Sequence, residues 1–487
     1  MAKSVAKNAL YNGIRTVCNM LFPLITYPYA ARVLMAENLG KVDFGQSVIS
    51  YFVLIAGLGI YTYATREGAA QRENKDELNQ FSSEVFTINV ASTVISYLLL
   101  GGLMLVWPRL HDYALLIAFQ SITIIGATIG VDWVYSIHED YGYITARSIV
   151  VQVISAVLLF VLVKQPSDYI IYAAITIFSN VGANVFNFFR ARRFVRIRLV
   201  WGFDYVRHLV PMLVLFGNAV AITVYVNIDV TLLNVFKGDY EVGIYSLAVK
   251  VYSILKALLN SITAVALPRL SLYRASGQEQ EYQDLQDAIS HALVVLVLPV
   301  MALFILMADY VVMIIGGEGY VASVGPLQML CIAIVPAVLA CYVTSAILLP
   351  NKGEKLNLKA TIAGAVTNLV ANFFVIPVFG VMGAAFTTAL AEAVVLVYSI
   401  YLSRPFCDWK HTVRVLRRPV VTAALCVALM ALANAGLRRV LGFDMAGFFV
   451  TGFCLVAVVL VTLLVCRDSL VVGFARKALG RRKASEE

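Results

Sequence analysis

The segment ENLGKVDFGQSVISY, residues 37–51, follows the first long apolar run of this 487-residue chain, and a related segment, YEVGIYSLAVKVYSI, occupies residues 240–254. Each joins a polar stretch to an apolar residue beside a glycine, and then to a helical pattern of small and polar residues. The two glycines, Gly40 and Gly243, lie six apolar runs apart. Because an even number of spans returns a chain to the same side of a membrane, this repeat predicts two parallel six-helix halves.

The composition indicates a membrane protein throughout. The chain is 60% hydrophobic and only 14% charged, with a mean hydropathy of +0.82, whereas soluble domains are about 25% charged. Apolar runs of about twenty residues, enough to cross a bilayer, predict an all-α polytopic protein of about fourteen spans. They are residues 8–31, 43–65, 81–107, 112–137, 143–164, 168–189, 208–236, 243–268, 288–308, 326–350, 357–379, 381–403, 419–437 and 446–466.

These spans predict three parts: an N-terminal six-helix lobe at 1–204, a C-terminal six-helix lobe at 205–404, and two extra helices with a basic tail at 405–487. The connections are predicted to be short, the longest being the polar segment 269–287. Most of the 38 Lys and Arg residues fall in alternate connections and at both ends. This bias predicts cytoplasmic termini.

The basic clusters at 190–198 and 480–487 adjoin spans, so they are expected to face anionic lipid head groups and not nucleic acid. No Walker loop and no metal-ligand spacing of the seven cysteines occurs, and no outer loop is long enough for a catalytic domain. We therefore expect no enzyme activity, no metal and no bound cofactor.

Polar residues recur at helical spacing inside several spans. Lipid-facing positions should be apolar, so such stripes must face protein or water. Two interpretations remain open, hydrogen bonding between helices and a shared water-filled cavity between the halves, which the whole set favours. The stripes are Asn8, Asn12, Arg15, Asn19 and Thr26; Thr176, Asn180, Asn184 and Asn187; Asn218, Tyr225 and Asp229; Ser246, Lys250, Ser253 and Ser261; Thr361, Asn368 and Asn372; and Thr388, Glu392 and Ser399.

Asp229 is an acid inside the seventh predicted span, where a carboxylate costs about 3 kcal/mol unless it is paired or hydrated. Lys250 lies at the same predicted depth, about 10 Å below the outer surface on the next span, which makes it the predicted partner. The pair is either a structural lock of one hairpin or a switch that releases Lys250 to substrate.

Other ionisable residues lie inside the predicted spans. Arg15 near the inner side, Lys256 near mid-depth and Lys250 near the outer side form a ladder of cations that suits an anionic cargo, although Lys256 is also able to face a neighbouring helix. Glu392 is either a site for H+ or Na+ or a counter-ion. At the inner end of the fourth span, Asp132 is a predicted partner of Arg147, for which Glu139 is the alternative.

Four blocks of sequence resemble Wzx-type flippases of lipid-linked oligosaccharides and occur in the same order as in that family. The family belongs to the multidrug/oligosaccharidyl-lipid/polysaccharide exporter superfamily. The four blocks are residues 25–69, 132–148, 227–254 and 380–396. The resemblance implies two six-helix lobes around a central cavity, alternating access, and H+ or Na+ coupling. It also implies an undecaprenyl-pyrophosphate-linked glycan as substrate, flipped across a bacterial inner membrane, with a polysaccharide polymerase or assembly protein as partner.

The resemblance implies that Arg15, Lys250 and Lys256, with the polar Asn19 and Asn218, contact the pyrophosphate or acidic sugars, while Asp229 and Glu392 serve charge balance or ion coupling.

The extra pair of helices at 419–466 resembles the lipid II flippase branch, where such helices form a groove for the lipid tail, so lipid II and teichoic-type precursors remain alternatives. A multidrug antiporter would want acids in the first lobe's cavity, where the first span offers Arg15. A further alternative is a membrane scaffold or assembly partner with no transport of its own. Such a protein would need no polar-lined cavity, so the polar stripes count against it.

Overall fold

The computed structural model describes residues 5–440, 445–466 and 468, and all regular structure among them is helical. Twelve helical runs within these residues are long and apolar enough to cross a membrane. The predicted all-α class is therefore confirmed. The count of fourteen spans remains a prediction, as do the three predicted domain ranges. The predicted basic anchor at 480–487 lies outside the described residues.

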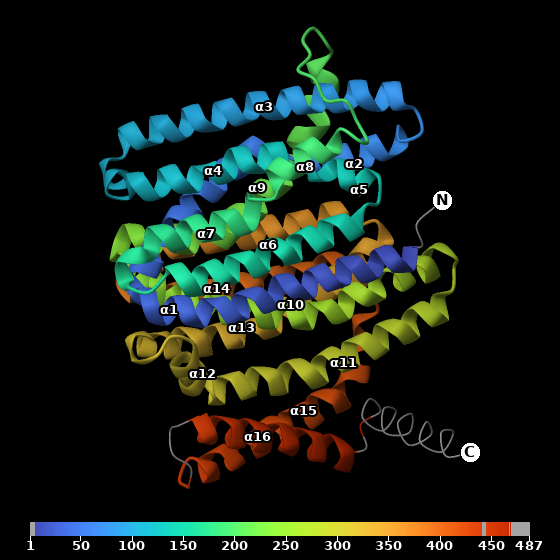
Figure 1. Ribbon diagram of the computed structural model, residues 1–487. Coiled ribbons are helices and arrows are strands. Elements are labelled where there is room, and N and C mark those ends of the chain that lie inside the picture. Colours follow the sequence, from blue (N-terminus) through green and yellow to red (C-terminus); the bar gives the residue numbers. More distant parts are fainter. Residues whose placement is uncertain (1–4, 441–444, 467, 469–487) are drawn as a thin grey trace, which may run out of the picture. The chain divides into compact units, whose positions relative to one another are not determined.

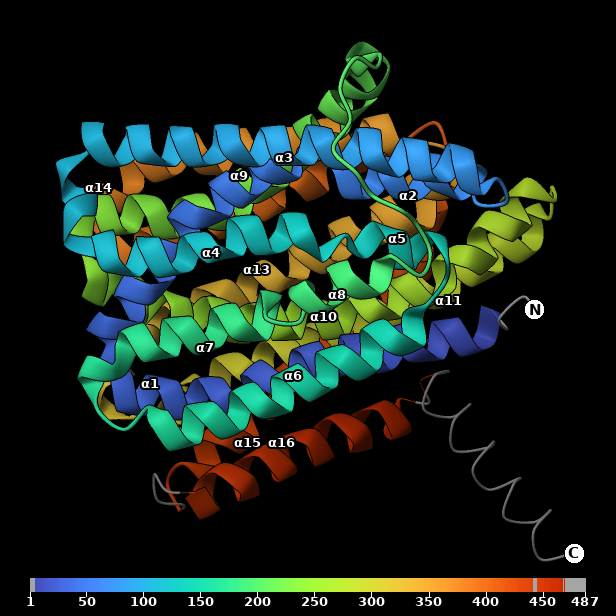
Figure 2. The same cartoon turned by 45° about the horizontal axis from the view of Figure 1, so that its top comes forward.

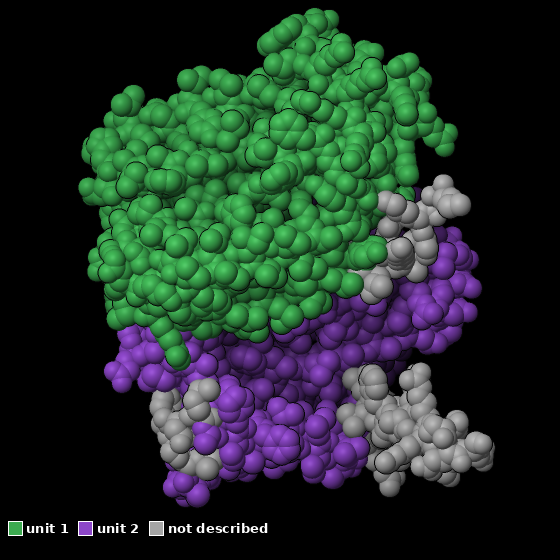
Figure 3. All heavy atoms as spheres, viewed as in Figure 1, with its two compact units in different colours: residues 1–246 green, residues 247–487 purple. Residues whose placement is uncertain are grey.

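The chain divides into two compact units, residues 1–246 and 247–487, coloured separately in Figure 3. Among its described residues, the first unit holds ten α-helices or parts of α-helices, labelled in Figure 1. They are α1 (Val5–Gly57), α2 (Ile60–Ala70), α3 (Lys75–Val106), α4 (Ala114–Gly130), α5 (Asp132–Ile137), α6 (Tyr141–Leu162), α7 (Tyr169–Val181), α8 (Asn184–Ala191), α9 (Tyr205–Lys237) and the first turns of α10 (Asp239–Ala275).

In the part of the second unit that the structure describes, the rest of α10 is followed by six further α-helices. They are α11 (Glu279–Leu306), α12 (Ala308–Ile315), α13 (Val324–Tyr342), α14 (Glu354–Ser403), α15 (Trp409–Leu437) and α16 (Met445–Val465). Within it, α13 packs against α14, and α11 packs against both α13 and α15. The pair α15 and α16 lies side by side in Figures 1 and 2.

α14 contains two of the predicted spans, and α1 contains one predicted span and most of a second. In the 53-residue α1, Met35 has φ 64° and ψ 168°, and in the 50-residue α14, Gly380 has φ 54° and ψ −131°. Neither pair of angles is helical, so the chain changes direction there while the helical hydrogen bonding resumes on both sides. The predicted spans 8–31 and 43–65, and likewise 357–379 and 381–403, lie on either side of these residues.

Several spans predicted as continuous are broken, two of them at residues with positive φ. Leu58 and Gly59, both with positive φ, separate α2 from α1, and Val131, with φ 39°, separates α5 from α4. Gly59 accepts this conformation because it has no Cβ. A Cβ there would lie 2.9 Å from the Met212 carbonyl oxygen of α9, so the break is also a point of close packing.

The predicted connection 269–287 is wrong, because α10 continues to Ala275 and α11 begins at Glu279. Most of its polar residues lie on the last turns of α10 and the first turns of α11. Three other helices begin with a polar capping residue. The side chains of Asn74, Asp204 and Asp408 accept hydrogen bonds from the first backbone N–H groups of α3, α9 and α15.

The segment between α8 and α9 runs along α3 in extended form. Three residues of α3 one turn apart accept hydrogen bonds from alternate backbone N–H groups of this segment, an arrangement that satisfies donors a loop would otherwise leave to water. Arg196, Arg198 and Val200 donate to Asn79, Ser83 and Thr87 at 2.7, 3.1 and 3.1 Å.

Inside the first unit, α1 packs against α3, α4, α6 and α9, and α4 packs against α7 and α8. Figures 1 and 2 both show α3 beside α4. One apolar cluster of α2, α3 and α5 surrounds Tyr63, Phe81 and Trp133, and another joins α1 to α4 around Phe44 and Ile49.

Candidate functional site

The two glycines of the sequence repeat face each other's helices. A Cβ on Gly40 of α1 would lie 1.9 Å from the Asp239 carbonyl oxygen, and one on Gly243 of α10 would lie 1.9 Å from that of Ala36. Both distances are far below van der Waals contact, so only glycine allows this approach. The repeat identified in the sequence therefore marks a reciprocal backbone contact between α1 and the start of α10.

Next to this contact, Arg109 closes the C-terminal end of α9. Its guanidinium donates to the carbonyl oxygens of Asn234 and Val235 at 2.7 and 2.8 Å, where a helix leaves acceptors without partners. Asp239 accepts from the Asn234 amide and the Tyr113 hydroxyl, each at 2.7 Å. The sequence pattern did not single out these residues, because each lies at the end of an apolar run.

Asp229 of α9 is buried, with 5% of its surface exposed. Its Oδ2 accepts a 2.6 Å hydrogen bond from the Tyr245 hydroxyl of α10. Tyr245 was missed because a tyrosine in an apolar run is indistinguishable from a core residue. The predicted partner, Lys250, is exposed and belongs to the second unit, so the pairing of Asp229 with Lys250 remains a prediction.

Two residues after Asp229, the Thr231 hydroxyl connects α9 to α1. It lies 3.1 Å from both the Ser47 and the Tyr51 hydroxyls. Together with the Tyr245 contact, these bonds give this part of α9 a polar side within the first unit. A polar region on an intramembrane helix is expected where the helix faces protein or water.

In the second unit, Glu392 of α14 is the centre of a charged group. Its side chain is 5% exposed, and its Oε1 accepts hydrogen bonds from the Lys256 ammonium and, at 2.8 Å, from the Tyr252 hydroxyl. Lys256 is 28% exposed, so one member of the ion pair still reaches the surface of the unit. Of the two orientations open to Lys256, the structure shows the one toward a neighbouring helix.

The polar residues predicted on α1 and α9 are accessible. Arg15 is half-buried and has no ion-pair partner among the described residues. Asn19 is exposed and its Oδ1 accepts from the Gln152 amide at 2.6 Å, while Asn218 is exposed on α9. The side chains of Asn8 and Asn12 lie outside the described residues.

Asp132 begins α5 at the break after α4. Its Oδ1 lies 3.4 Å from Arg147 Nη1 and accepts a 2.9 Å hydrogen bond from the Asn187 amide. The sequence left two partners open for Arg147, and the structure pairs it with Asp132. The other candidate, Glu139, forms an ion pair with Arg72 at 3.2 Å.

Several of the predicted polar stripes are buried packing contacts and do not line a cavity. Asn368 and Asn372 are fully buried, bond to each other at 3.1 Å, and contact the buried Thr387. Asn184 is also buried and donates to the Gly126 carbonyl at 2.9 Å. For these residues the structure shows the first of the two interpretations left open, hydrogen bonding between helical segments. The Asn368 Nδ2 group is buried and has no hydrogen-bond partner among the described residues.

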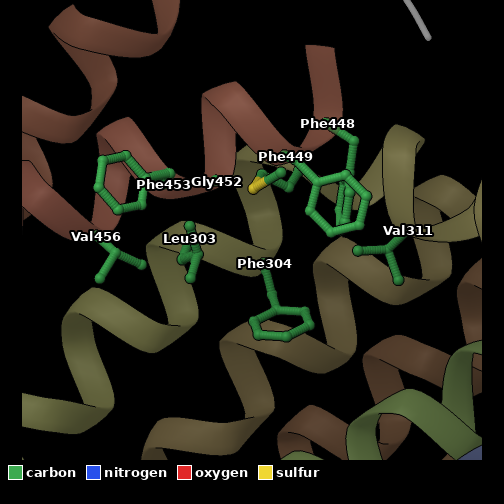
Figure 4. Close-up of a pocket in the computed structure, with 9 residues that line it drawn as sticks. Leu303, Phe304, Val311, Phe448, Phe449, Gly452, Phe453 and Val456 are labelled. Carbon is green, nitrogen blue, oxygen red and sulfur yellow. The ribbon is translucent and has the colours of Figure 1, made fainter. Parts of the chain in front are cut away.

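Where α16 meets α11 and α12, the second unit has an apolar groove of about 310 Å³ (Figure 4). Phe304 and Val311 approach it from one side, and Phe449 and Phe453 from α16. The groove is lined by Leu303, Phe304, Met307, Val311, Phe448, Phe449, Gly452, Phe453 and Val456.

Between the spans, His138 has a titratable ring in a half-buried position. Its Nδ1 donates to the Val134 carbonyl at 2.9 Å, and the ring lies 4.5 Å from that of Phe194 between centroids. Burial lowers the pKa of His138 below its ordinary value, and the positive charge of Arg72 adds to this, against the hydrogen bond to Val134 and the charge of Asp140.

Comparison with known proteins gives one family and a fold. The sequence profile of the family described as polysaccharide biosynthesis protein matches residues 5–274. A protein of Shigella dysenteriae named as a candidate O-antigen transporter is 24% identical over 410 residues, which cover 81% of this chain and 98% of the relative.

Two solved structures share the fold. The lipid II flippase MurJ, in an inward closed conformation, superposes with a TM-score of 0.75 at 13% identity, over 95% of this chain and 100% of MurJ. An inward-facing multidrug resistance MATE family transporter of the MOP superfamily gives 0.54 at 14% identity, over 84% and 98%. The fold is thus that of the MOP transporters, and because the family profile covers more than half of the sequence, the chain belongs to the polysaccharide biosynthesis protein family.

Proposed function

We propose that this multi-pass membrane protein is a flippase that moves an undecaprenyl-pyrophosphate-linked oligosaccharide from the cytoplasmic to the periplasmic leaflet of a bacterial inner membrane. The observation that carries the proposal is the match to nearly the whole length of a protein named for O-antigen transport. A half-buried Arg15 without an ion-pair partner among the described residues supports an anionic cargo, because a guanidinium binds phosphate through paired hydrogen bonds.

In the proposed cycle the cavity first opens to the cytoplasm, where Arg15 and Asn19 meet the pyrophosphate and sugars. The carrier then opens outward, and the head group passes along Asn218 and Lys256 toward Lys250. The apolar groove beside α16 would suit a segment of polyprenyl tail, since its lining residues offer only apolar surface. A polysaccharide polymerase or assembly protein is the partner proposed to receive the product.

An ion gradient is proposed to drive the cycle, with H+ or Na+ binding at Asp229 or Glu392. Both carboxylates are buried and hydrogen-bonded to a tyrosine. A bound cation would change the charge balance at either carboxylate, and differential affinity of the two states for that cation would bias the conformational equilibrium.

Flipping of a fluorescent undecaprenyl-pyrophosphate oligosaccharide in proteoliposomes, with and without an imposed H+ or Na+ gradient, tests the proposal. We expect gradient-driven flipping that falls at least about tenfold in Arg15→Ala, the loss of a charge-assisted phosphate contact. Arg193→Ala, a substitution at an exposed arginine between α8 and α9, is the matched control and should flip at the wild-type rate.

Three other results would contradict the proposal. Wild-type protein that leaves the oligosaccharide in place but exports an organic cation is a multidrug antiporter. If the protein flips lipid II or a teichoic-type precursor but not the undecaprenyl-pyrophosphate oligosaccharide, the proposed substrate is wrong. Equal flipping by wild type and Arg15→Ala would remove the role given to this arginine.

A further inference from the structure

A second group of buried titratable residues lies in the first unit, away from the residues considered above. Glu84 of α3, His208 of α9 and Tyr63 of α2 are 9%, 3% and 4% exposed. His208 Nε2 lies 2.9 Å from Glu84 Oε2, and His208 Nδ1 lies 2.9 Å from the Tyr63 hydroxyl. The Gln80 amide donates to the other Glu84 oxygen at 2.9 Å. The three helices thus meet in one hydrogen-bonded line.

The surroundings of this line are apolar and aromatic. The rings of Phe81 and Phe203 each have their centroids 5.9 Å from that of His208, and Tyr63 is part of the apolar cluster of α2, α3 and α5. Groups buried in this way interact more strongly with each other than exposed groups do. A change of one charge here therefore has a large effect on the local energy.

The hydrogen bonds define two protonation states. With Glu84 ionised and His208 neutral, Nε2–H donates to the carboxylate and Nδ1 accepts from the Tyr63 hydroxyl, so every polar atom is satisfied but the group carries one buried negative charge. A proton added to Nδ1 gives an imidazolium beside the carboxylate, with no net charge. The Tyr63 hydroxyl must then turn, because Nδ1–H has become a donor.

Opposing effects act on the two protonation states. A lone buried charge is costly, which favours uptake of the proton. Opposing this are the displaced Tyr63 hydroxyl and the nearby cations. The charged groups that act on the site are Arg66 and Glu67 of α2, which pair at 3.0 Å, and Arg207 of α9. The backbone N–H of Arg198 is bonded to Ser83, next to Glu84 in α3, but its side chain is exposed.

The line also lies at a structural discontinuity. Pro211, three residues after His208, interrupts the backbone hydrogen bonding of α9. One turn after His208, the Met212 carbonyl oxygen lies 2.9 Å from the position that a Cβ on Gly59 would take, at the break between α1 and α2. Breaks and proline positions are where helices bend, so the hydrogen bonds of His208 connect the N-terminal turn of α9 to α2 and α3 beside a candidate hinge.

We propose that Glu84, His208 and Tyr63 form a proton-binding site, in which uptake of one proton at His208 Nδ1 reverses the Tyr63 hydrogen bond and shifts α9 relative to α2. The use of this site in transport rests on the proposed flippase function; the binding of the proton does not. The site is distinct from Asp229 and Glu392, which lie elsewhere on α9 and on α14.

Nitrogen-15 NMR of the full-length, histidine-labelled protein in lipid vesicles tests proton binding directly, because imidazole nitrogen shifts report tautomer and charge. Between pH 5 and pH 8.5, we expect the His208 signal, which is identified by its loss in His208→Gln, to change between the Nε2–H tautomer and the imidazolium. Glu84→Gln should abolish the transition in this range, because the imidazolium loses its carboxylate. His111→Gln, which changes an exposed ring, is the control.

If His208→Gln does not fold, Tyr63→Phe serves in its place. It keeps the carboxylate and imidazole but removes the hydroxyl that is hydrogen-bonded to Nδ1, so the pH dependence of the His208 signal should differ from that of wild type. A His208 signal that keeps one protonation state across the whole range in wild type and in Tyr63→Phe would overturn the proposal.

Flipping rates in the same vesicles separate this proposal from the one before it. We expect the wild-type rate to change about fivefold or more across the His208 transition, and this change to be absent from the pH profile of Glu84→Gln. Flipping by Glu84→Gln with the wild-type pH profile would overturn the coupling to α9. A titrating His208 in a protein that moves no oligosaccharide would support the proton site and defeat the flippase.

Discussion

At the scale of single residues, the Glu392 ion pair shows why the two partners are not equivalent. Glu392 is 5% exposed and Lys256 is 28% exposed. Removing Lys256 leaves a buried carboxylate with only the Tyr252 hydroxyl. Removing the charge of Glu392 leaves a lysine that water can reach.

We therefore expect Lys256→Met to destabilise the protein by about 3 kcal/mol, more than Glu392→Gln does. The double substitution Lys256→Met with Glu392→Leu should recover much of the loss, since no unpaired charge remains. Thermal unfolding in detergent micelles measures all three. If Lys256→Met and Glu392→Gln lowered the stability equally, the difference in burial between the two partners would not determine the energetic cost of removing either charge.

His138 gives a residue-scale expectation for pH. Since burial and Arg72 lower the pKa of His138 in the folded protein, the unfolded state binds this proton first as the pH falls. Its contribution to stability is complete above about pH 6.5 and is lost as the pH falls through the lowered value. The slope has a ceiling of about 1.4 kcal/mol per pH unit for one group.

In His138→Gln this part of the acid destabilisation should be absent. Melting temperatures of the two proteins from pH 4.5 to pH 8 provide the comparison, with His111→Gln as the control for loss of a histidine. A steeper acid decline in His138→Gln than in wild type would mean that the sign of the shift is wrong.

At the scale of helices, the reciprocal glycine contact between α1 and α10 tolerates no side chain. A methyl group on Gly40 or Gly243 would have to displace backbone, 1.9 Å away in each case. We expect Gly40→Ala and Gly243→Ala each to cost about 1–3 kcal/mol, the range for overpacked sites. Thermal unfolding and the initial rate of flipping measure the effect.

Gly102→Ala in α3 is the matched control, because no atom lies within 4 Å of its added Cβ. A methyl group there should be neutral or slightly stabilising, since alanine favours a helix by about 1 kcal/mol over glycine. If Gly40→Ala were as benign as Gly102→Ala, the close approach of α1 and α10 would not be required.

At the scale of the whole molecule, the orientation in the membrane follows from the distribution of charge. The excess of Lys and Arg in alternate connections predicts cytoplasmic termini. In a variant with all seven native cysteines replaced, Arg193→Cys should resist a membrane-impermeant maleimide in intact spheroplasts, and Arg439→Cys should react. The reverse pattern would invert the proposed topology, and equal labelling would show that one connection is placed wrongly.

The sequence predicted those features that depend on one span at a time. Apolar runs located the helices, and the repeat around Gly40 and Gly243 predicted a relation that appears as a direct backbone contact. It missed the breaks at Gly59 and Val131, because hydropathy is insensitive to backbone angles. It favoured a water-filled cavity for the polar stripes as a set, whereas amides such as Asn372 are buried in contacts between helical segments, since helical spacing identifies a polar side but not its neighbour.

The site was predicted in its charges more than in its contacts. Asp132 and Arg147 lie close together, as one of two suggested pairings. The tyrosines that donate to Asp229 and Glu392 were not predicted, nor was the meeting of Glu84 with His208, which are 124 positions apart in the chain. Contacts at that separation depend on how the helices assemble, which a pattern within one helix does not contain.

The extended segment along α3 has a consequence for protease digestion. Four exposed arginines at 192, 193, 196 and 198 make it an apparent target for trypsin. Cleavage requires a stretch of backbone that can leave the surface, yet the N–H groups of Arg196 and Arg198 are held by Asn79 and Ser83. Limited trypsinolysis should therefore cut after residues 192 and 193 first, and Ser83→Ala should open the later positions. The attachment to α3 would then act as protection against degradation, in a connection whose composition alone would mark it as vulnerable.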